Sequence, residues 1–197
     1  MQYFEEILHF YPAGKIPGLY LSKLTYQMEP FVAQVAPYYH RYIALVQGND
    51  IISHLEKSMT ESLEFLSTIT EDQSHYAYAP GKWTIKEVMG HLIDAERIFA
   101  YRALRIARKD KTNLPGFEEN DYVAAAGFNG IKWADLLHQF RTLRQSNVAL
   151  FYTFSETQLQ QEGTANDAPT NVKALIYIIA GHHLHHMNVI KERYLEK

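Results

Sequence analysis

The sequence predicts an all-α protein folded as a four-helix bundle. Four long segments carry apolar residues at the 3.6-residue spacing of an amphipathic helix, and residues typical of helix N-caps precede three of them. No segment alternates between apolar and polar residues at a period of two, so we expect no β-strands. Amphipathic helices of this length bury their apolar faces against one another, which favours the bundle.

The first two helices have clear start signals. The first covers residues 50–69, with Asn49 or Asp50 as its N-cap. The second begins at a capping-box pattern, in which Thr84 and Glu87 each accept a hydrogen bond from the other's backbone amide, and it runs to about Lys109. Their apolar faces comprise Ile52, Leu55, Met59, Leu63, Leu66 and Ile69 in the first helix, and Val88, Leu92, Ala95 and Phe99 in the second.

A long connection at residues 110–130 joins the second helix to the third. We expect a short helical turn near Tyr122–Ala126 within it, and a connection of this length is often functional or a crossover. The third helix covers about 131–154, and Thr170 caps a fourth at 171–194. The inward residues of the third helix are Leu136, Leu137, Phe140 and Leu143.

Length and composition favour one domain. With 197 residues, of which 47% are apolar and 21% charged, the chain is long enough to bury a full core. Residues 1–27 are punctuated by prolines and glycines and lack a sustained period. We therefore expect an N-terminal extension at 1–27 and a helical-bundle domain at 28–197.

The composition also disfavours several classes of function. The net charge of −3 includes no basic stripe, so we expect no nucleic-acid partner. The absence of cysteine excludes disulfides, zinc–thiolate sites and a cysteine nucleophile, and fits a reducing compartment. No stretch approaches the ~18 apolar residues of a membrane helix, and the acidic N-terminus does not resemble a secretory signal. We expect a cytoplasmic protein without a membrane partner.

Four of the ten histidines lie at positions 181–186, in the sequence GHHLHH. His182 and His186 are spaced i, i+4, which places both on one helix face, as a chelated metal ion requires. A divalent cation would satisfy both imidazoles, since each polar group buried without a partner costs ~1–3 kcal/mol. The pair also continues an apolar seam formed by Leu175, Ile179 and Val189.

The pair alone also permits an ordinary interpretation, because histidines cluster on solvent-facing helices and buried ones bond carboxylates or carbonyls. His183 and His185 point away from the seam, and His183 has Met187 rather than a chelating residue at i+4. A zincin-type protease is excluded, because His183 stands where that motif requires glutamate.

His91 on the second helix favours a metal site. It shares a face with Val88 and Ala95, and Gly90 before it leaves room for close approach of a facing helix. Together with the pair on the last helix it would form a three-histidine site with open coordination positions, as in catalytic centres. Nitrogen ligands suit Zn²⁺, Ni²⁺, Fe²⁺ and Cu²⁺. We expect a divalent transition metal, with Zn, Ni, Fe and Mn as the ions to test.

Four stretches, in this order, resemble the DinB-like superfamily in its YfiT-like branch of metal-dependent hydrolases: GKWTIKEVMGHL at 81–92, RIFAYRALR at 97–105, LPGFEENDY at 114–122 and IAGHHLHH at 179–186. The resemblance covers about residues 30–197. It implies a four-helix bundle in which one histidine of the second helix and an H-x-x-x-H pair of the last bind a divalent metal. Carried over to this chain, these are His91, His182 and His186. Relatives resemble it at His185 too but carry an acid or another residue at His183.

Other residues are weaker candidates for the chemistry. The long connection could fold over the metal and contribute Glu118, Asn120 or Tyr122 to a substrate pocket, or it could be an ordinary surface crossover. Asp94 or Glu96 could orient the second nitrogen of His91 or act as a base, although charges one turn along a helix are usually only solvated.

Three functions stay open. The favoured one is a hydrolase in which a metal-bound water, its pKa lowered toward ~7, attacks a bond of a small molecule. The resemblance also implies a low-molecular-weight-thiol S-transferase, whose thiol would come from a cofactor because the chain has no cysteine. The third is a non-catalytic binding protein related to stress response. A homodimer through exposed aromatics such as Tyr101 and Phe128 is a further expectation.

Overall fold

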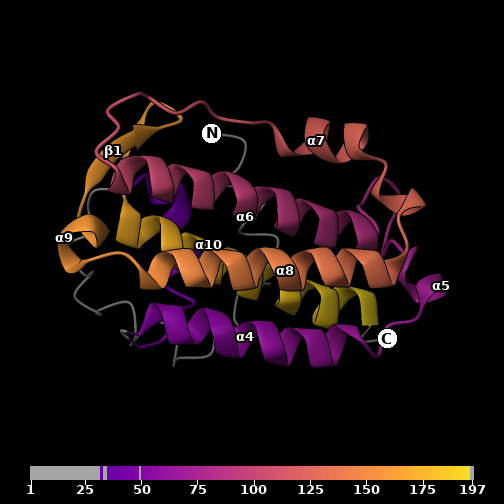
Figure 1. Ribbon diagram of the computed structural model, residues 1–197. Coiled ribbons are helices and arrows are strands. Elements are labelled where there is room, and N and C mark those ends of the chain that lie inside the picture. Colours follow the sequence, from indigo (N-terminus) through magenta and orange to yellow (C-terminus); the bar gives the residue numbers. More distant parts are fainter. Residues whose placement is uncertain (1–31, 33–34, 49, 196–197) are drawn as a thin grey trace, which may run out of the picture. The chain divides into compact units, whose positions relative to one another are not determined.

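Four long helices form most of the described part of the computed structural model (Figure 1). They are α4 (Ile51–Leu66), α6 (Ile85–Ala107), α8 (Trp133–Tyr152) and α10 (Val172–Val189). They lie side by side, which confirms the predicted four-helix bundle. The structure describes residues 32, 35–48 and 50–195, all of which belong to one compact unit, Phe31–Lys197. The predicted extension at 1–27 lies outside the described residues.

Helix starts follow the predicted caps at two of these helices. The Asp50 carboxylate accepts a hydrogen bond from the Ser53 amide at 3.2 Å and caps α4. At α6 the capping box is complete, because the Thr84 amide donates to Glu87 at 2.7 Å and the Glu87 amide donates to the Thr84 hydroxyl at 3.1 Å. Two further capping boxes start the short helices α5 (Glu71–Ser74) and α9 (Glu156–Leu159).

The connection between α6 and α8 contains α7 (Glu119–Ala126), where a helical turn was predicted, and the 3-10 turn η2 (Phe128–Gly130). Phe128 is only 7% exposed, so its predicted place on a dimer surface is wrong. Its ring packs onto Gly90, where a Cβ atom would lie 2.4 Å from the ring. The close approach at Gly90 therefore serves this connection rather than a facing helix.

The prediction of no strands is also wrong. Strands β1 (Glu162–Ala165) and β2 (Ala168–Asn171) form an antiparallel hairpin, with positive φ angles at Asn166 and Asp167 in its two-residue turn. Four-residue strands are too short to show a period of two. The predicted cap is wrong by one residue: strand β2 extends to Asn171 and α10 begins at Val172, so Asn171 rather than Thr170 caps α10 and accepts from the Ala174 amide at 2.8 Å.

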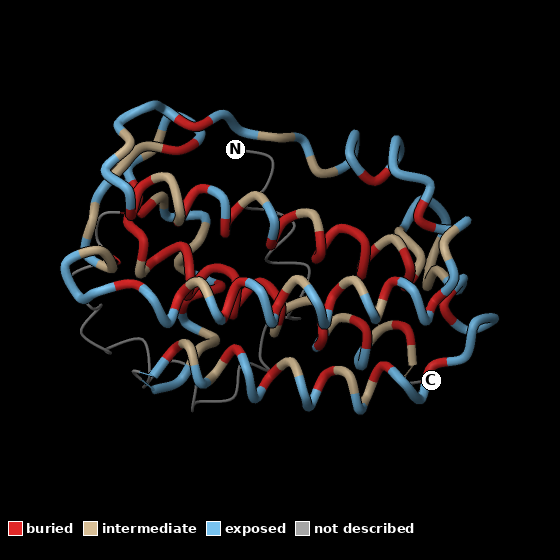
Figure 2. The backbone as a smooth tube through the Cα atoms, in the orientation of Figure 1, coloured by how far each residue is buried: buried red, intermediate tan, exposed pale blue. Residues whose placement is uncertain are grey.

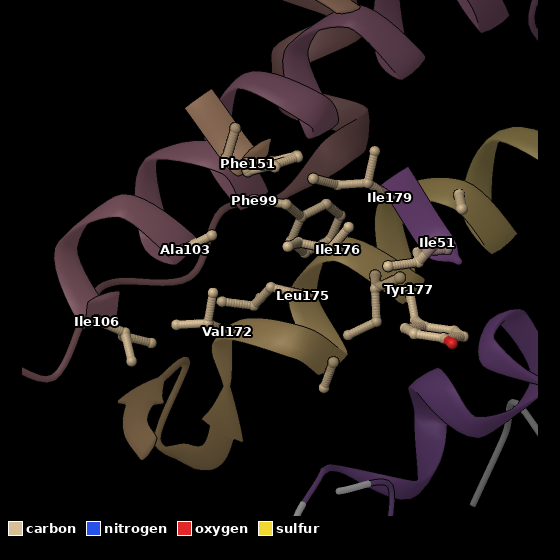
Figure 3. Close-up of a cluster of buried hydrophobic side chains, with 14 of the residues drawn as sticks. Ile51, Phe99, Ala103, Ile106, Phe151, Val172, Leu175, Ile176, Tyr177 and Ile179 are labelled. Carbon is tan, nitrogen blue, oxygen red and sulfur yellow. The ribbon is translucent and has the colours of Figure 1, made fainter. Parts of the chain in front are cut away.

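Helix α10 is buried along most of its length (Figure 2). Its first half packs with α6 in an apolar cluster, where Phe99 lies beside Ile176 and Ile179 (Figure 3). Before α4 come η1 (Pro37–Tyr39) and α3 (His40–Ile43), and the π-helical turn η3 (Ile190–Leu195) follows α10. Within the described ranges, no helix has both the length and the apolar character that crossing a lipid bilayer requires.

Candidate metal centre

The structure brings together the three histidines singled out from the sequence. His91 of α6 and the pair of α10 direct their Nε2 atoms at one point. The Nε2 atom of His182 lies 3.1 Å from Nε2 of His91 and 3.1 Å from Nε2 of His186. One ligand atom from each of the three lies within 4.8 Å of the others, and in the described part of the chain no other group of histidine or acidic side chains has this arrangement.

Helix geometry explains the convergence. The i, i+4 spacing places His182 and His186 one above the other on α10, with their ring centroids 4.6 Å apart. Helix α6 packs along α10, so His91 meets both rings, at centroid distances of 4.9 and 5.1 Å. Two helices therefore supply all three imidazoles.

This donor set fits a divalent transition ion. Metal–nitrogen bonds of about 2.0–2.1 Å at tetrahedral angles place neighbouring ligand atoms about 3.3 Å apart, close to the spacing found here. Without a cation, the Nε2 atom of His182 faces the Nε2 atoms of His91 and His186 at hydrogen-bond distance. A nitrogen of a neutral imidazole either donates one hydrogen bond or accepts one, so His182 can satisfy only one of these two contacts. The Nδ1 atom of His186 is buried and has no partner among the described residues.

The protonation states suit metal binding. Burial lowers the pKa of His91 to about 4, with a smaller contribution from His185. Burial and the neighbouring imidazoles hold the pKa values of His182 and His186 well below the usual range. All three are therefore neutral near pH 7, with the lone pairs that a metal ligand needs.

Aromatic side chains surround the three histidines. The ring centroid of Trp83 lies 4.9 Å from that of His91, and the ring centroid of Phe99 lies 6.3 Å from that of His182. Tyr42 of α3 meets His182 edge-on at 5.2 Å. Gly181 permits this last contact, because a Cβ atom there would lie 1.9 Å from the Tyr42 carbonyl oxygen. The site is thus partly shielded from water.

The other two histidines of the last helix differ from each other. His185 is half-buried at the rim of the cluster, 5.0 Å from the His186 ring. His183 does point away from the seam, as predicted, but it is 1% exposed. Its ring stacks on Phe140 at 5.1 Å and its Nε2 pairs with the Ser62 hydroxyl at 2.8 Å. It therefore lies in the core between helices, away from the three convergent Nε2 atoms.

The weaker candidates are placed elsewhere. Glu96 is buried and binds Arg144 and Asn147, and Asp94 pairs with Arg97 near the surface. In α7, Glu118 caps the helix and accepts hydrogen bonds from the backbone and side-chain amides of Asn120. Tyr122 is exposed and its ring packs with Phe117. None of these contacts reaches the histidine cluster.

Three features of the residues around the histidine cluster could not be predicted from the sequence. Arg144 is fully buried, although a charge in an amphipathic pattern is normally assigned to the solvent side. Lys86 is also buried, where it pairs with Glu71 and His75. Tyr42 belongs to a four-residue helix, which is too short to give a periodic signal. The Gly181 in the histidine motif is the one local sign that another backbone approaches there.

Comparisons with known proteins agree with this architecture. The model of the DinB superfamily matches residues 54–190. The chain is similar in fold to YfiT from Bacillus subtilis, described as "a probable metal-dependent hydrolase with an unusual four-helix bundle topology". The two share 18% sequence identity, and the match covers 75% of this chain and 90% of that chain with a TM-score of 0.63. It is also similar to the DinB-like protein YjoA from Bacillus subtilis, with 22% identity, coverage of 73% and 87%, and a TM-score of 0.53.

A comparison with curated proteins gives no match. The superfamily match spans well over half of the 197 residues and includes all three convergent histidines. The chain therefore belongs to the DinB superfamily, as the sequence motifs predicted.

Proposed function

We propose that this protein is a divalent-metal-dependent hydrolase of a small-molecule substrate, with His91, His182 and His186 as the metal ligands. The observation that carries the proposal is the convergence of their three Nε2 atoms at 3.1 Å contacts. The description of YfiT as a probable metal-dependent hydrolase supports it.

When bound, a divalent ion lowers the pKa of a coordinated water toward about 7 and polarises the bond to be cleaved. Three neutral imidazoles, those of His91, His182 and His186, would hold the ion. Tyr42, Trp83 and Phe99 restrict the approach of bulk water. No fourth histidine or acidic side chain joins the three within the part of the chain that is described. Open positions of this kind are typical of catalytic rather than structural sites.

One observation favours a second candidate. No carboxylate of the described residues lies with the three histidines, where many metal-dependent hydrolases place a general base. A thiol cofactor that binds as its thiolate needs no such base, which favours a low-molecular-weight-thiol S-transferase as the alternative. A cytoplasmic location, a homodimer and a role in stress response stay predictions from the sequence.

The first experiment is elemental analysis of protein purified without a histidine tag. We expect a near-stoichiometric transition metal in the wild type and its loss in His91→Ala, His182→Ala and His186→Ala. His138→Ala removes an exposed histidine of α8 and is the matched control, which should keep the metal. A wild type that is metal-free and cannot be loaded with Zn²⁺, Ni²⁺, Mn²⁺ or Fe²⁺ would refute the metal-dependent function.

The loaded enzyme then separates the two reactions. Cleavage of small esters or amides without added thiol supports the hydrolase. Consumption of an electrophile only when a low-molecular-weight thiol is present supports the transferase. The His186→Ala variant should lack whichever activity is found, and equal activity in that variant would assign it to a contaminant.

A further inference from the structure

We infer that this site selects substrates that carry a carboxylate or phosphate group, and that Arg41 binds this group. The inference rests on the proposed function, because it concerns the substrate of the same site. It depends on where two arginines lie and on the absence of ion pairs to them among the described residues.

Arg41 is fixed at the rim of the histidine cluster by its aromatic neighbours. Its guanidinium lies 4.3 Å from the ring centroid of Tyr38 and 4.7 Å from that of Tyr42. It donates a hydrogen bond of 2.8 Å to the Tyr42 hydroxyl. The Tyr42 ring in turn contacts His182 and His185, at 5.2 and 5.4 Å. One aromatic ring thus separates this exposed cation from a proposed metal ligand.

Arg102 of α6 has an analogous position. Its guanidinium lies 5.6 Å from the Phe99 ring, and that ring lies 6.3 Å from His182. Arg102 is only 3% exposed and donates a hydrogen bond of 2.6 Å to the Pro115 carbonyl oxygen. A buried guanidinium normally pairs with a carboxylate, whereas Arg102 bonds two neutral groups, the Pro115 carbonyl and the Tyr39 side chain.

Neither arginine has an acidic partner within the described ranges. The ion pairs found there, with atoms up to 4.0 Å apart, involve neither residue. Burial raises the pKa of the Glu119 carboxyl in α7, and the nearby positive charge of Arg41 opposes this rise. Glu119 and Arg41 nevertheless form no ion pair.

The site therefore concentrates positive charge. A divalent ion held by three neutral imidazoles would keep its full charge, and two guanidinium groups stand one ring away. An excess of positive charge at a site raises the local concentration of anions there. The guanidinium fork matches the oxygens of a carboxylate or phosphate. A substrate anion on Arg41 would place the rest of the molecule toward the open metal positions.

Calorimetric titration of Co²⁺-loaded protein tests this inference. The ligands are benzoate, phenyl phosphate and the neutral analogue benzamide. We expect the wild type to bind one of the anions at least 10-fold more tightly than benzamide. Arg41→Gln should weaken anion binding roughly 10- to 100-fold, the usual loss for a charge-assisted hydrogen bond, and Arg41→Lys should retain part of it. The tighter of the two anions identifies the substrate group.

The matched control is Arg141→Gln, which removes the same charge from an exposed position of α8. It should bind the anions as the wild type does, and Co²⁺ affinity should be the same in all variants. Equal binding of anions and benzamide would overturn the inference. So would an Arg41→Gln variant that binds anions as Arg141→Gln does.

Failure of the metal site gives a different result. If the wild type binds no Co²⁺, the proposed function fails, and the same titrations are run on the metal-free protein. A preference for anions that disappears in Arg41→Gln would then uphold the anion site without a metal. No preference in metal-free protein would overturn the inference as well.

Discussion

Glu96 of α6 and Arg144 of α8 form a two-pronged ion pair inside the bundle. The Nε and Nη2 atoms of Arg144 donate to Oε1 and Oε2 of Glu96, each at 2.8 Å. Asn147 donates to the same carboxylate at 3.1 Å, and Arg144 also donates to the Leu55 carbonyl oxygen of α4 at 3.3 Å. Glu96 and Arg144 are 4% and 0% exposed. The carboxylate is thus committed to α8 rather than to His91.

Glu96→Ala should lower the free energy of unfolding by about 3–5 kcal/mol, because it leaves the Arg144 guanidinium buried without its counter-ion. Urea denaturation monitored by circular dichroism measures this. The double variant Glu96→Met/Arg144→Leu should recover much of the loss, since apolar residues of similar size often replace a buried pair without cost. A loss below 1 kcal/mol in Glu96→Ala would show that the pair is not buried.

Gly181→Ala should push α3 away from α10. The added Cβ would lie 1.9 Å from the Tyr42 carbonyl oxygen, and backbone atoms cannot move aside as a flexible side chain does. We expect a loss of about 1–3 kcal/mol in the free energy of unfolding, as for other overpacked positions. Gly130→Ala is the control, because its Cβ would meet no atom within 4 Å. Equal thermal stability of the two variants would contradict the contact.

Ser62→Ala should separate a structural histidine from the proposed metal ligands. The substitution removes the hydroxyl partner of His183 Nε2 in the core and should cost about 1–3 kcal/mol of stability. Metal content should not change, because His183 lies apart from the three convergent atoms. Ser67→Ala, at an exposed position of the same region, should change neither quantity. Loss of metal in Ser62→Ala would show that His183 takes part in the site.

Acid should destabilise the metal-free protein between pH 6.5 and about 4. Imidazoles of the unfolded chain titrate near pH 6.5, whereas burial lowers the pKa of His91 to about 4. The unfolded state therefore binds more protons in this window, and stability falls as the pH falls through it. The shift at His91 alone corresponds to about 3 kcal/mol. Denaturation curves of His91→Leu should depend less on pH than those of the wild type, and an equal pH dependence of the two proteins would contradict the shift.

A bound metal should stabilise the fold. A metal concentration of about 100 times the dissociation constant adds about 2.7 kcal/mol, which raises the melting temperature of a chain of this size by roughly 5–10 °C. Differential scanning calorimetry with and without Zn²⁺ measures the shift, and a chelator should reverse it. His186→Ala should show no shift. A shift of the same size in that variant would place the metal elsewhere.

Much of the fold and the convergence of the histidines could be predicted because both depend on local spacing. The capping boxes and the 3.6-residue periodicity are properties of single helices. The pair on α10 follows from i, i+4 geometry alone, and His91 from its position on the apolar face of α6. The superfamily motifs then supplied what local spacing does not contain, namely that the two helices pack together.

The features that were missed depend on tertiary contacts. Helix α10 is buried on more than one side, so His183 is inside although it lies off the predicted seam. Arg144 and Glu96 look like solvated charges until the helices that hold them are brought together. Thr170 looked like a helix cap, but strand β2 continues to Asn171 and α10 begins at Val172, so Asn171 is the residue at the cap position.

The polar contacts of α4 also determine its alignment. Its buried residues are Ile51, Leu55, Ser58, Ser62 and Leu66, and the apolar ones among them make contacts that have no preferred direction. Two directional bonds oppose such a slip: Arg144 bonds the Leu55 carbonyl oxygen, and His183 bonds the Ser62 hydroxyl two turns further along. A shifted α4 would leave a buried cation and a buried imidazole each short of a partner, so these bonds help to fix the position of α4 along the bundle.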